Sequence, residues 1–151
     1  MAKLEEDTWV LVADGAKALF LRNETEAENP HLVVVRKEEQ DNPATRQQGT
    51  DAPGRRPDTG TGQRSAMEDT DWHRLAEDRF ADDLAGKLYD MAQSDRFERI
   101  VLVAAPKVLG EMRHKLHPEV IARVVGEVHK TLTNHPVDEI ERIVAAELRD
   151  A

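Results

Sequence analysis

The 151-residue sequence contains no cysteine. This absence excludes a disulfide framework, a thiol nucleophile, and any zinc or iron–sulfur site that depends on cysteine ligands. No apolar run approaches the roughly 20 residues that a membrane-spanning helix needs, so we expect no membrane insertion. Residues 1–7 are acidic and lack the apolar segment of a signal peptide, which predicts a cytoplasmic protein.

Positive charge is also scarce. The chain has 21 Lys and Arg against 30 Asp and Glu, which gives a net charge of −9. A protein that binds polyanions over its whole surface needs the opposite balance, so the composition disfavours that class. The length fits one domain over residues 1–151 rather than two.

Residues 44–66 differ from the rest because they contain no Val, Ile, Leu, Met, Phe, Trp or Tyr. They hold four of the eight glycines and two of the seven prolines. Four arginines against two aspartates give this segment a charge of +2, and subtracting it from the total of −9 leaves −11 on the remainder. Without apolar anchors the segment cannot offset the entropy cost of ordering, so we predict a mobile loop within the domain. Its arginines are Arg46, Arg55, Arg56 and Arg64.

Three strands are predicted before this loop. Residues 8–13 and 32–35 are short apolar runs rich in β-forming residues. Residues 18–21 would return after Asp14-Gly15, a dipeptide that suits the positive φ angles of a two-residue hairpin turn. The pattern predicts an antiparallel meander.

The hydrophobic period changes after the loop. Apolar residues at three- and four-residue steps predict a long amphipathic helix, and Ser65 with Glu68 fits a capping box near its start. Residues 100–104 predict a central strand that is buried on both faces. Pro106 and Pro136 would open two further helices. The expected buried stripe of the long helix is Trp72, Leu75, Ala76, Phe80, Leu84, Leu88 and Met91.

Residues 120–128 fit both a helical period and strand alternation, and their β-branched content with Gly126 favours a strand. The sum is an α/β fold, with a mixed sheet of about five strands flanked by helices and its first three strands antiparallel. We expect one continuous core, made by Trp9, Val10, Leu11, Val12, Phe80, Leu84, Val101, Leu102, Val103, Ile140 and Val144.

Two clusters outside the loop are candidate sites. His114 and His117 are three residues apart and could share a metal, but no third ligand is indicated. With Lys107, Arg113 and Lys115 they form a basic cluster, for which a solvated, salt-bridged helix face is the favoured interpretation. We therefore predict no metal and no cofactor.

Several segments together resemble a known family. They are Trp9-Val10-Leu11-Val12-Ala13-Asp14-Gly15, Gln63-Arg64-Ser65-Ala66-Met67-Glu68, Arg79-Phe80-Ala81, Val101-Leu102-Val103-Ala104-Ala105-Pro106 and Leu132-Thr133-Asn134-His135-Pro136. Their order and spacing resemble the bacterial host attachment proteins, also described as proteins required for attachment to host cells. That family is similar to the middle domain of archaeal and eukaryotic peptide-chain release factors.

The resemblance implies a ribonuclease-H-like sheet with a long loop before its first helix. In release factors this loop carries Gly-Gly-Gln, which promotes hydrolysis of the peptidyl-tRNA ester on the ribosome. The matching positions here are Thr61-Gly62-Gln63, so the first Gly is replaced by Thr. The resemblance makes Gly62 and Gln63 the candidate catalytic residues. Arg46, Arg55, Arg56 and Arg64 are the candidate RNA-binding residues.

Two functions follow. The first is an intracellular factor associated with the ribosome or with RNA, whose Gly-Gln loop could act on peptidyl-tRNA. The second is a non-enzymatic factor that binds a protein partner and affects attachment to host cells or surfaces indirectly. The basic loop favours the first, and the overall acidity favours the second.

Overall fold

A computed structural model describes the backbone of residues 3–40 and 62–150, with side chains described for residues 3–40 and 73–149. Its five strands are β1 (Trp9–Ala13), β2 (Lys17–Asn23), β3 (Leu32–Glu39), β4 (Ile100–Val103) and β5 (Val124–Val128). The predicted strands are all present.

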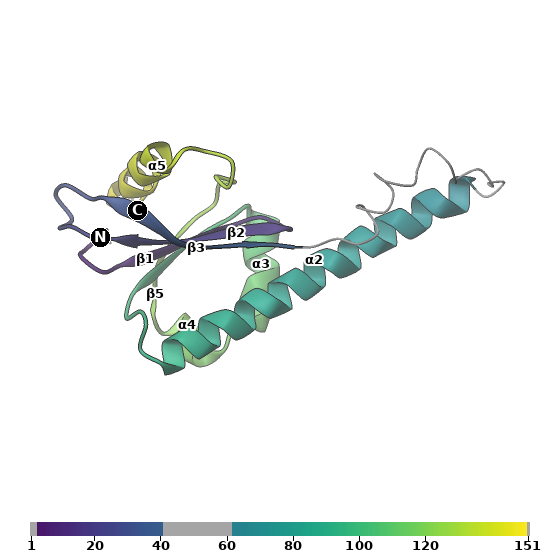
Figure 1. Ribbon diagram of the computed structural model, residues 1–151, viewed down its shortest axis with the longest axis horizontal. Coiled ribbons are helices and arrows are strands. Elements are labelled where there is room, and N and C mark those ends of the chain that lie inside the picture. The colour runs from purple at the N-terminus through teal and green to yellow at the C-terminus, as the bar shows by residue number, and fades with distance from the viewer. Residues whose placement is uncertain (1–2, 41–61, 151) are drawn as a thin grey trace.

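The strands form one sheet in the order β3-β2-β1-β4-β5 (Figure 1). The pairs β1/β2 and β2/β3 are antiparallel, whereas β1/β4 and β4/β5 are parallel. This confirms the mixed α/β sheet with an antiparallel first half. The parallel half brings the carboxyl ends of β1, β4 and β5 to the same edge of the sheet.

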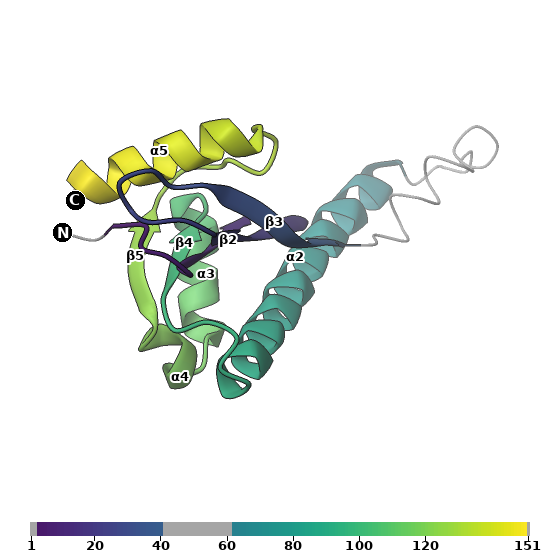
Figure 2. The same cartoon turned by 60° about the vertical axis from the view of Figure 1, so that its left-hand side comes forward.

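The helices are α2 (Gly62–Gln93), α3 (Pro106–Lys115), α4 (Pro118–Ile121) and α5 (Val137–Asp150). Figures 1 and 2 show α2, α3 and α4 on one face of the sheet and α5 on the other. Pro106 opens α3 as predicted, and Pro136 immediately precedes α5, where its carbonyl accepts the N–H groups of Glu139 and Ile140. None of these helices has the length and hydropathy that crossing a membrane requires.

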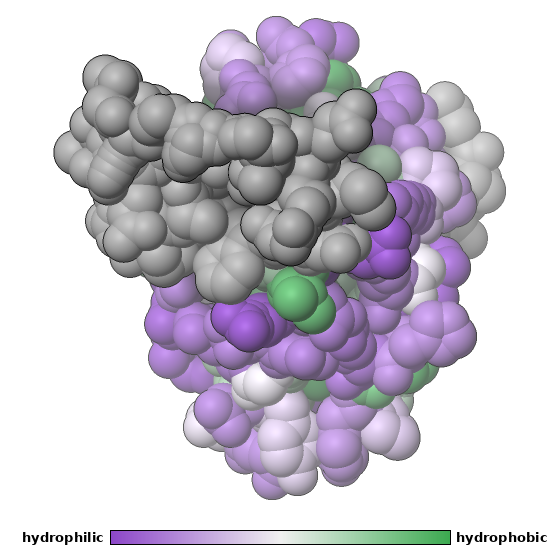
Figure 3. Space-filling model, turned by 90° about the vertical axis from the view of Figure 1, so that its right-hand side faces the viewer, coloured by the Kyte–Doolittle hydropathy of each residue, from purple (hydrophilic) through white to green (hydrophobic). Residues whose placement is uncertain are grey.

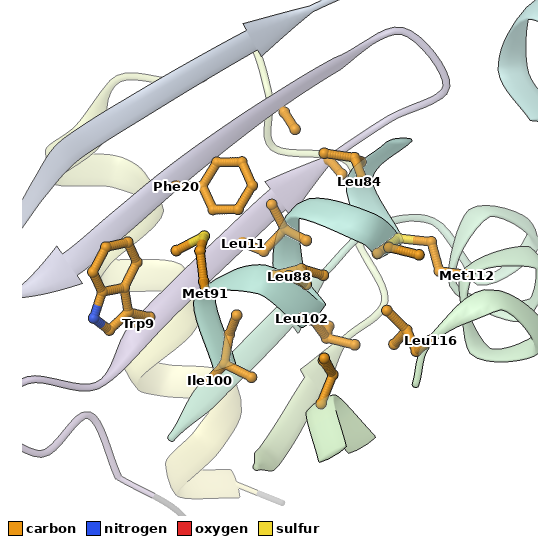
Figure 4. Packing of buried hydrophobic residues seen from close by; sticks show 14 of the residues in the cluster. Trp9, Leu11, Phe20, Leu84, Leu88, Met91, Ile100, Leu102, Met112 and Leu116 are labelled. Atoms are coloured by element: carbon orange, nitrogen blue, oxygen red, sulfur yellow. The ribbon is translucent and has the colours of Figure 1, made fainter. Parts of the chain in front are cut away.

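The hydrophobic core consists of two layers, one on each face of the sheet, so the prediction of one continuous core is wrong. Trp9 and Leu11 pack with α2 and α3, while the alternating residues Val10 and Val12 pack with α5. Because successive side chains of a strand point to opposite faces, a sheet covered on both sides divides its apolar residues into two layers. All eleven residues predicted for the core are nevertheless buried. Figure 4 shows the layer beneath α2 and α3.

The turn after β1 differs from the predicted two-residue hairpin. Ala13 pairs with Ala18, and no described glycine has a positive φ. The turn is closed by a backbone hydrogen bond from the N–H of Asp14 to the carbonyl of Lys17, at 2.9 Å, and by the Asp14 carboxylate, whose Oδ1 accepts the N–H groups of Ala16 and Lys17, both at 2.8 Å. An aspartate that bonds to backbone amides two and three residues ahead replaces the glycine-dependent turn.

The ambiguous residues 120–128 divide between a helical turn and a strand. Val120 is buried in α4, and β5 begins at Val124, so the strand interpretation is confirmed for the second half. A Cβ atom on Gly126 would lie 2.7 Å from Cδ2 of Leu148. Gly126 therefore allows α5 to pack directly on β5.

The long helix departs from the predicted buried stripe at one described residue. Ala76, Phe80, Leu84, Leu88 and Met91 are buried as expected, but Leu75 is 53% exposed. Leu75 lies beside the stripe that Ala76 and Phe80 define, where α2 begins to leave the sheet. The side chain of Trp72 lies outside the described ones.

Candidate functional site

The candidate site residues lie at or before the start of α2. Arg46, Arg55 and Arg56, with most of the loop predicted over 44–66, lie outside the described residues. Gly62, Gln63 and Arg64 are the first three residues of α2, and their side chains are outside the described ones.

The helix thus begins three residues before Ser65, so the capping box does not mark its start. The residues around Ser65 have high helix propensity, since Gln, Arg, Ala and Met all favour the helix. Gly62 and Gln63 therefore belong to the first turn of α2 and not to the preceding loop. The first turn of a helix contains backbone N–H groups without intrahelical acceptors.

The N-terminal part of α2 extends away from the sheet, which is plain in Figures 1 and 2. Ala76 is the first α2 residue whose side chain is described as buried. At a rise of about 1.5 Å per residue, Gln63 lies about 20 Å along the helix from Ala76. The fold places the Gly62-Gln63 backbone at the outer end of a helical arm.

Gln40 ties the base of this arm to the sheet. Its backbone N–H donates to the carbonyl of Ala16 at 2.7 Å, and its side-chain Nε2 donates to the carbonyl of Ala76 at 2.7 Å. Gln40, at the end of the described segment 3–40, and Ala76 of α2 therefore meet beside the β1–β2 turn. A Cβ atom on neighbouring Gly15 would lie 2.7 Å from Oε2 of Glu77, so a larger residue there would displace the Glu77 side chain.

Asp14 joins three elements at the carboxyl end of β1. Besides closing the β1–β2 turn, its Oδ2 accepts the hydroxyl of Thr133 at 2.7 Å. Thr133 is 2% exposed and lies in the loop between β5 and α5. Lys17 reaches the same loop through its Nζ, which lies 3.5 Å from Oδ1 of Asn134. Asp14 therefore acts as a structural link between the hairpin and α5.

A pocket of about 110 Å³ opens between the β1–β2 turn, α2 and α3. Its floor is apolar and belongs to the core layer of Figure 4, in which Leu84 and Met112 are labelled. Charged side chains lie at its rim. It occupies the position outside the carboxyl ends of parallel strands where open α/β sheets commonly bind ligands.

Two basic residues of α3, Arg113 and Lys115, take part in a salt-bridged surface, as the favoured interpretation predicts. Lys115 Nζ lies 2.9 Å from both Asp78 and Asp82 on α2, and these hydrogen bonds raise the pKa of Lys115. Arg113 binds the carboxylate of Glu127 on β5 through Nε, at 3.1 Å, and through Nη2. The hydrogen bond with Arg113 lowers the pKa of Glu127.

The histidine pair is separated by the end of α3. His117 is the N-cap of α4, where its Nδ1 accepts the N–H of Glu119 at 3.0 Å, and its ring stacks on Tyr89 with centroids 4.2 Å apart. His114 lies in the last turn of α3. Within the described part of the chain, no three His, Cys, Asp or Glu side chains are grouped to hold a metal ion.

Seen from the side on which the start of α2 lies, the described surface is mainly hydrophilic, with isolated apolar spots (Figure 3). This is the polar character expected of a domain that carries a net charge of −9.

A family model identifies the chain. The model of bacterial archaeo-eukaryotic release factor family 12 matches residues 7–144, and the protein belongs to that family. No curated protein matches the sequence. The membership confirms the resemblance to release factors and indicates a translation-related role.

Sequence reasoning missed three features of this region. Gln40 comes directly after the polar end of β3, and no sequence pattern indicates that it links the sheet to α2. The Asp14–Thr133 bond joins residues that are 119 positions apart. The pocket rim combines helix residues that each fit a solvated face, so no local signal separates them from ordinary surface charge.

Proposed function

We propose that this protein is a ribosome- or RNA-associated factor that presents Gly62 and Gln63 at the end of the α2 arm. The observation that carries this proposal is geometric: the backbone of these residues opens a helix about 20 Å before Ala76, the first of its described side chains that is buried. Family membership supports a role in translation. The distribution of charge, +2 on residues 44–66 within a chain of −9, supports contact with RNA through the arm.

The first turn of α2 offers suitable chemistry. Its N–H groups and the positive end of the helix dipole favour a phosphate or a carbonyl oxygen that is gaining negative charge. A glutamine amide cannot act as a general base at neutral pH, so Gln63 would orient water or donate a hydrogen bond. Thr61 restricts the backbone where the release-factor motif has glycine. We therefore expect hydrolysis of a peptidyl-tRNA ester to be weak or absent.

The test is release of labelled peptide from stalled ribosome complexes. We expect Gln63→Ala to leave ribosome binding within about twofold of wild type and to remove any release. Gln93→Ala, at the other end of α2, is the matched control. Binding without release by the wild-type protein would define a binding factor, and unchanged release by Gln63→Ala would contradict the role of Gln63.

A second candidate is a non-enzymatic factor that binds a protein partner and affects attachment to host cells indirectly. Val34 and Val35 favour it, because they are 44% and 42% exposed on the edge strand β3, where a partner could contact them. Co-purification with the tagged protein separates the candidates. Recovery of ribosomes supports the first, and a stoichiometric protein partner lost in Val34→Asp supports the second.

A further inference from the structure

The proposed ribosome-associated function does not involve the pocket between the β1–β2 turn, α2 and α3. This pocket has an apolar floor. Phe80, Leu84 and Met112 form this floor and are at most 5% exposed as residues, and Val108 is half-buried beside them. The volume of about 110 Å³ has room for about four water-sized groups. It suits a short alkyl chain and is too small for a nucleotide.

The rim of the pocket carries three carboxylates, from Asp14, Glu77 and Glu111, and one ammonium, from Lys107. The oxygens of Asp14 already accept hydrogen bonds from the turn and from Thr133. Glu77 and Glu111 take part in no ion pair between described side chains, whereas Asp78 and Asp82 on α2 are paired with Lys115. Among the described lining residues, the rim therefore has an excess negative charge of two.

The fold holds these carboxylates at the pocket. Glu77 lies next to the buried stripe of α2, because it precedes Phe80 and Ala81 by three and four residues, and its own side chain is exposed. Its carboxylate lies against Gly15, where a Cβ atom would come within 2.7 Å of Oε2. Glu111 precedes the buried Met112 on α3. Like charges gathered at one mouth repel each other, and a bound cation relieves that repulsion.

We propose that this pocket binds an alkylammonium group, with its methylene stem on the apolar floor and its ammonium on the carboxylates of Glu77 and Glu111. The negative charge of the rim favours a cation as the ligand. The apolar floor favours a ligand with an alkyl stem, because a bare metal ion would leave the floor uncovered. This chemistry is shared by free aliphatic diamines and by the lysine side chain of a partner protein. The site is independent of the Gly62-Gln63 proposal.

The experiment is calorimetric titration of the full chain at low ionic strength with 1,4-diaminobutane, n-butylammonium and Nα-acetyl-lysine amide. Amide chemical shifts of isotope-labelled protein locate the binding. We expect saturable binding that shifts the amides of Gly15, Val108 and Glu111. Tighter binding of the diamine than of the lysine amide identifies a free diamine as the ligand, and the reverse order identifies a lysine side chain.

Two pairs of variants separate a site from general attraction to an acidic protein. Glu77→Gln with Glu111→Gln should weaken binding about tenfold, since each lost ion pair removes a fraction of a kcal/mol to about 1 kcal/mol. Glu5→Gln with Glu26→Gln removes the same charge elsewhere and should change binding less than twofold. Gly15→Ala, which displaces Glu77, should weaken binding, whereas Gly86→Ala has open space around its Cβ and should not.

Three results would overturn the proposal. They are no saturable binding of any alkylammonium to the wild-type protein, equal losses in the two double variants, and n-butylammonium binding no tighter than potassium at equal ionic strength. Circular dichroism of each variant checks that a loss of binding is not a loss of fold.

Discussion

At the scale of single residues, the packing of α5 on the sheet depends on Gly126. Replacing it with alanine would bring Cβ within 2.7 Å of Cδ2 of the buried Leu148, so this side chain or α5 must move. We expect Gly126→Ala to lower the free energy of unfolding by about 1–2 kcal/mol, the usual cost of overpacking. Urea denaturation measures the change.

The matched control is Gly110→Ala, in the interior of α3, where a Cβ atom meets nothing within 4 Å. Alanine is the better helix former, so we expect stability to be unchanged or to rise by up to about 1 kcal/mol. Equal effects of the two substitutions would contradict the close contact of β5 with α5.

The Arg113–Glu127 pair predicts a pH dependence. The hydrogen bond with Arg113 lowers the pKa of Glu127 from its ordinary value of 4.5. A carboxyl group with a depressed pKa in the folded state contributes stability above its unfolded pKa, and this contribution is lost as the pH falls through the folded pKa. We therefore expect the stability difference between wild type and Glu127→Gln to shrink as the pH falls below about 4.5.

Titration of the Glu127 side-chain carboxyl by nuclear magnetic resonance measures this directly. We expect a midpoint below 4.5 in the wild type, moving upward in Arg113→Gln. A Glu127 midpoint at or above the ordinary value in the wild type would show that the pair does not form in solution.

At the scale of elements, Gln40 defines where the α2 arm begins. Gln40→Ala removes the hydrogen bond to the carbonyl of Ala76 and should destabilise the protein by about 1 kcal/mol. It should also speed hydrogen exchange of amides near Ala76 more than those near Leu88, since Leu88 lies deep in the core. Exchange that rises equally along α2 would contradict a local clamp. Gln93→Ala, at the exposed end of the helix, is the control.

The strands could be predicted from sequence because their signal is local. Residues 9–13 and 100–103 are unbroken apolar runs, and both strands are buried on both faces. The end of β3 could not be predicted, since Arg36 to Glu39 are polar and join the strand through backbone pairing with β2. The division of the core also lacked a local signal, because it depends on which helix covers each face.

The candidate site was predictable only in part. The segment before α2 stands out because it lacks apolar residues, and the helix after it has a clear hydrophobic period of three to four residues. The point where α2 meets the sheet is marked by contacts of Gln40 with Ala76 and of Gly15 with Glu77. Such contacts between residues distant in sequence leave no periodic trace.

At the scale of the whole molecule, charge and shape act together. Three arginines of residues 44–66 precede α2 in the sequence and the fourth, Arg64, lies in its first turn, while the remainder of the chain carries −11 in a total of −9. An acidic body is repelled by RNA phosphates, so contact through the arm would orient the protein on a ribosome. Such binding should depend steeply on salt, because each neutralised phosphate releases counterions.

Co-sedimentation with ribosomes over a range of salt concentrations measures directly whether the protein binds ribosomes through Arg55 and Arg56. We expect wild-type binding that weakens steeply with salt. In Arg55→Ala with Arg56→Ala, binding should weaken and the slope of log affinity against log salt should fall by about 1.5. Arg96→Ala with Arg142→Ala removes the same charge from the body and should leave the slope unchanged. Absence of ribosome binding by the wild-type protein at every salt concentration would contradict the account.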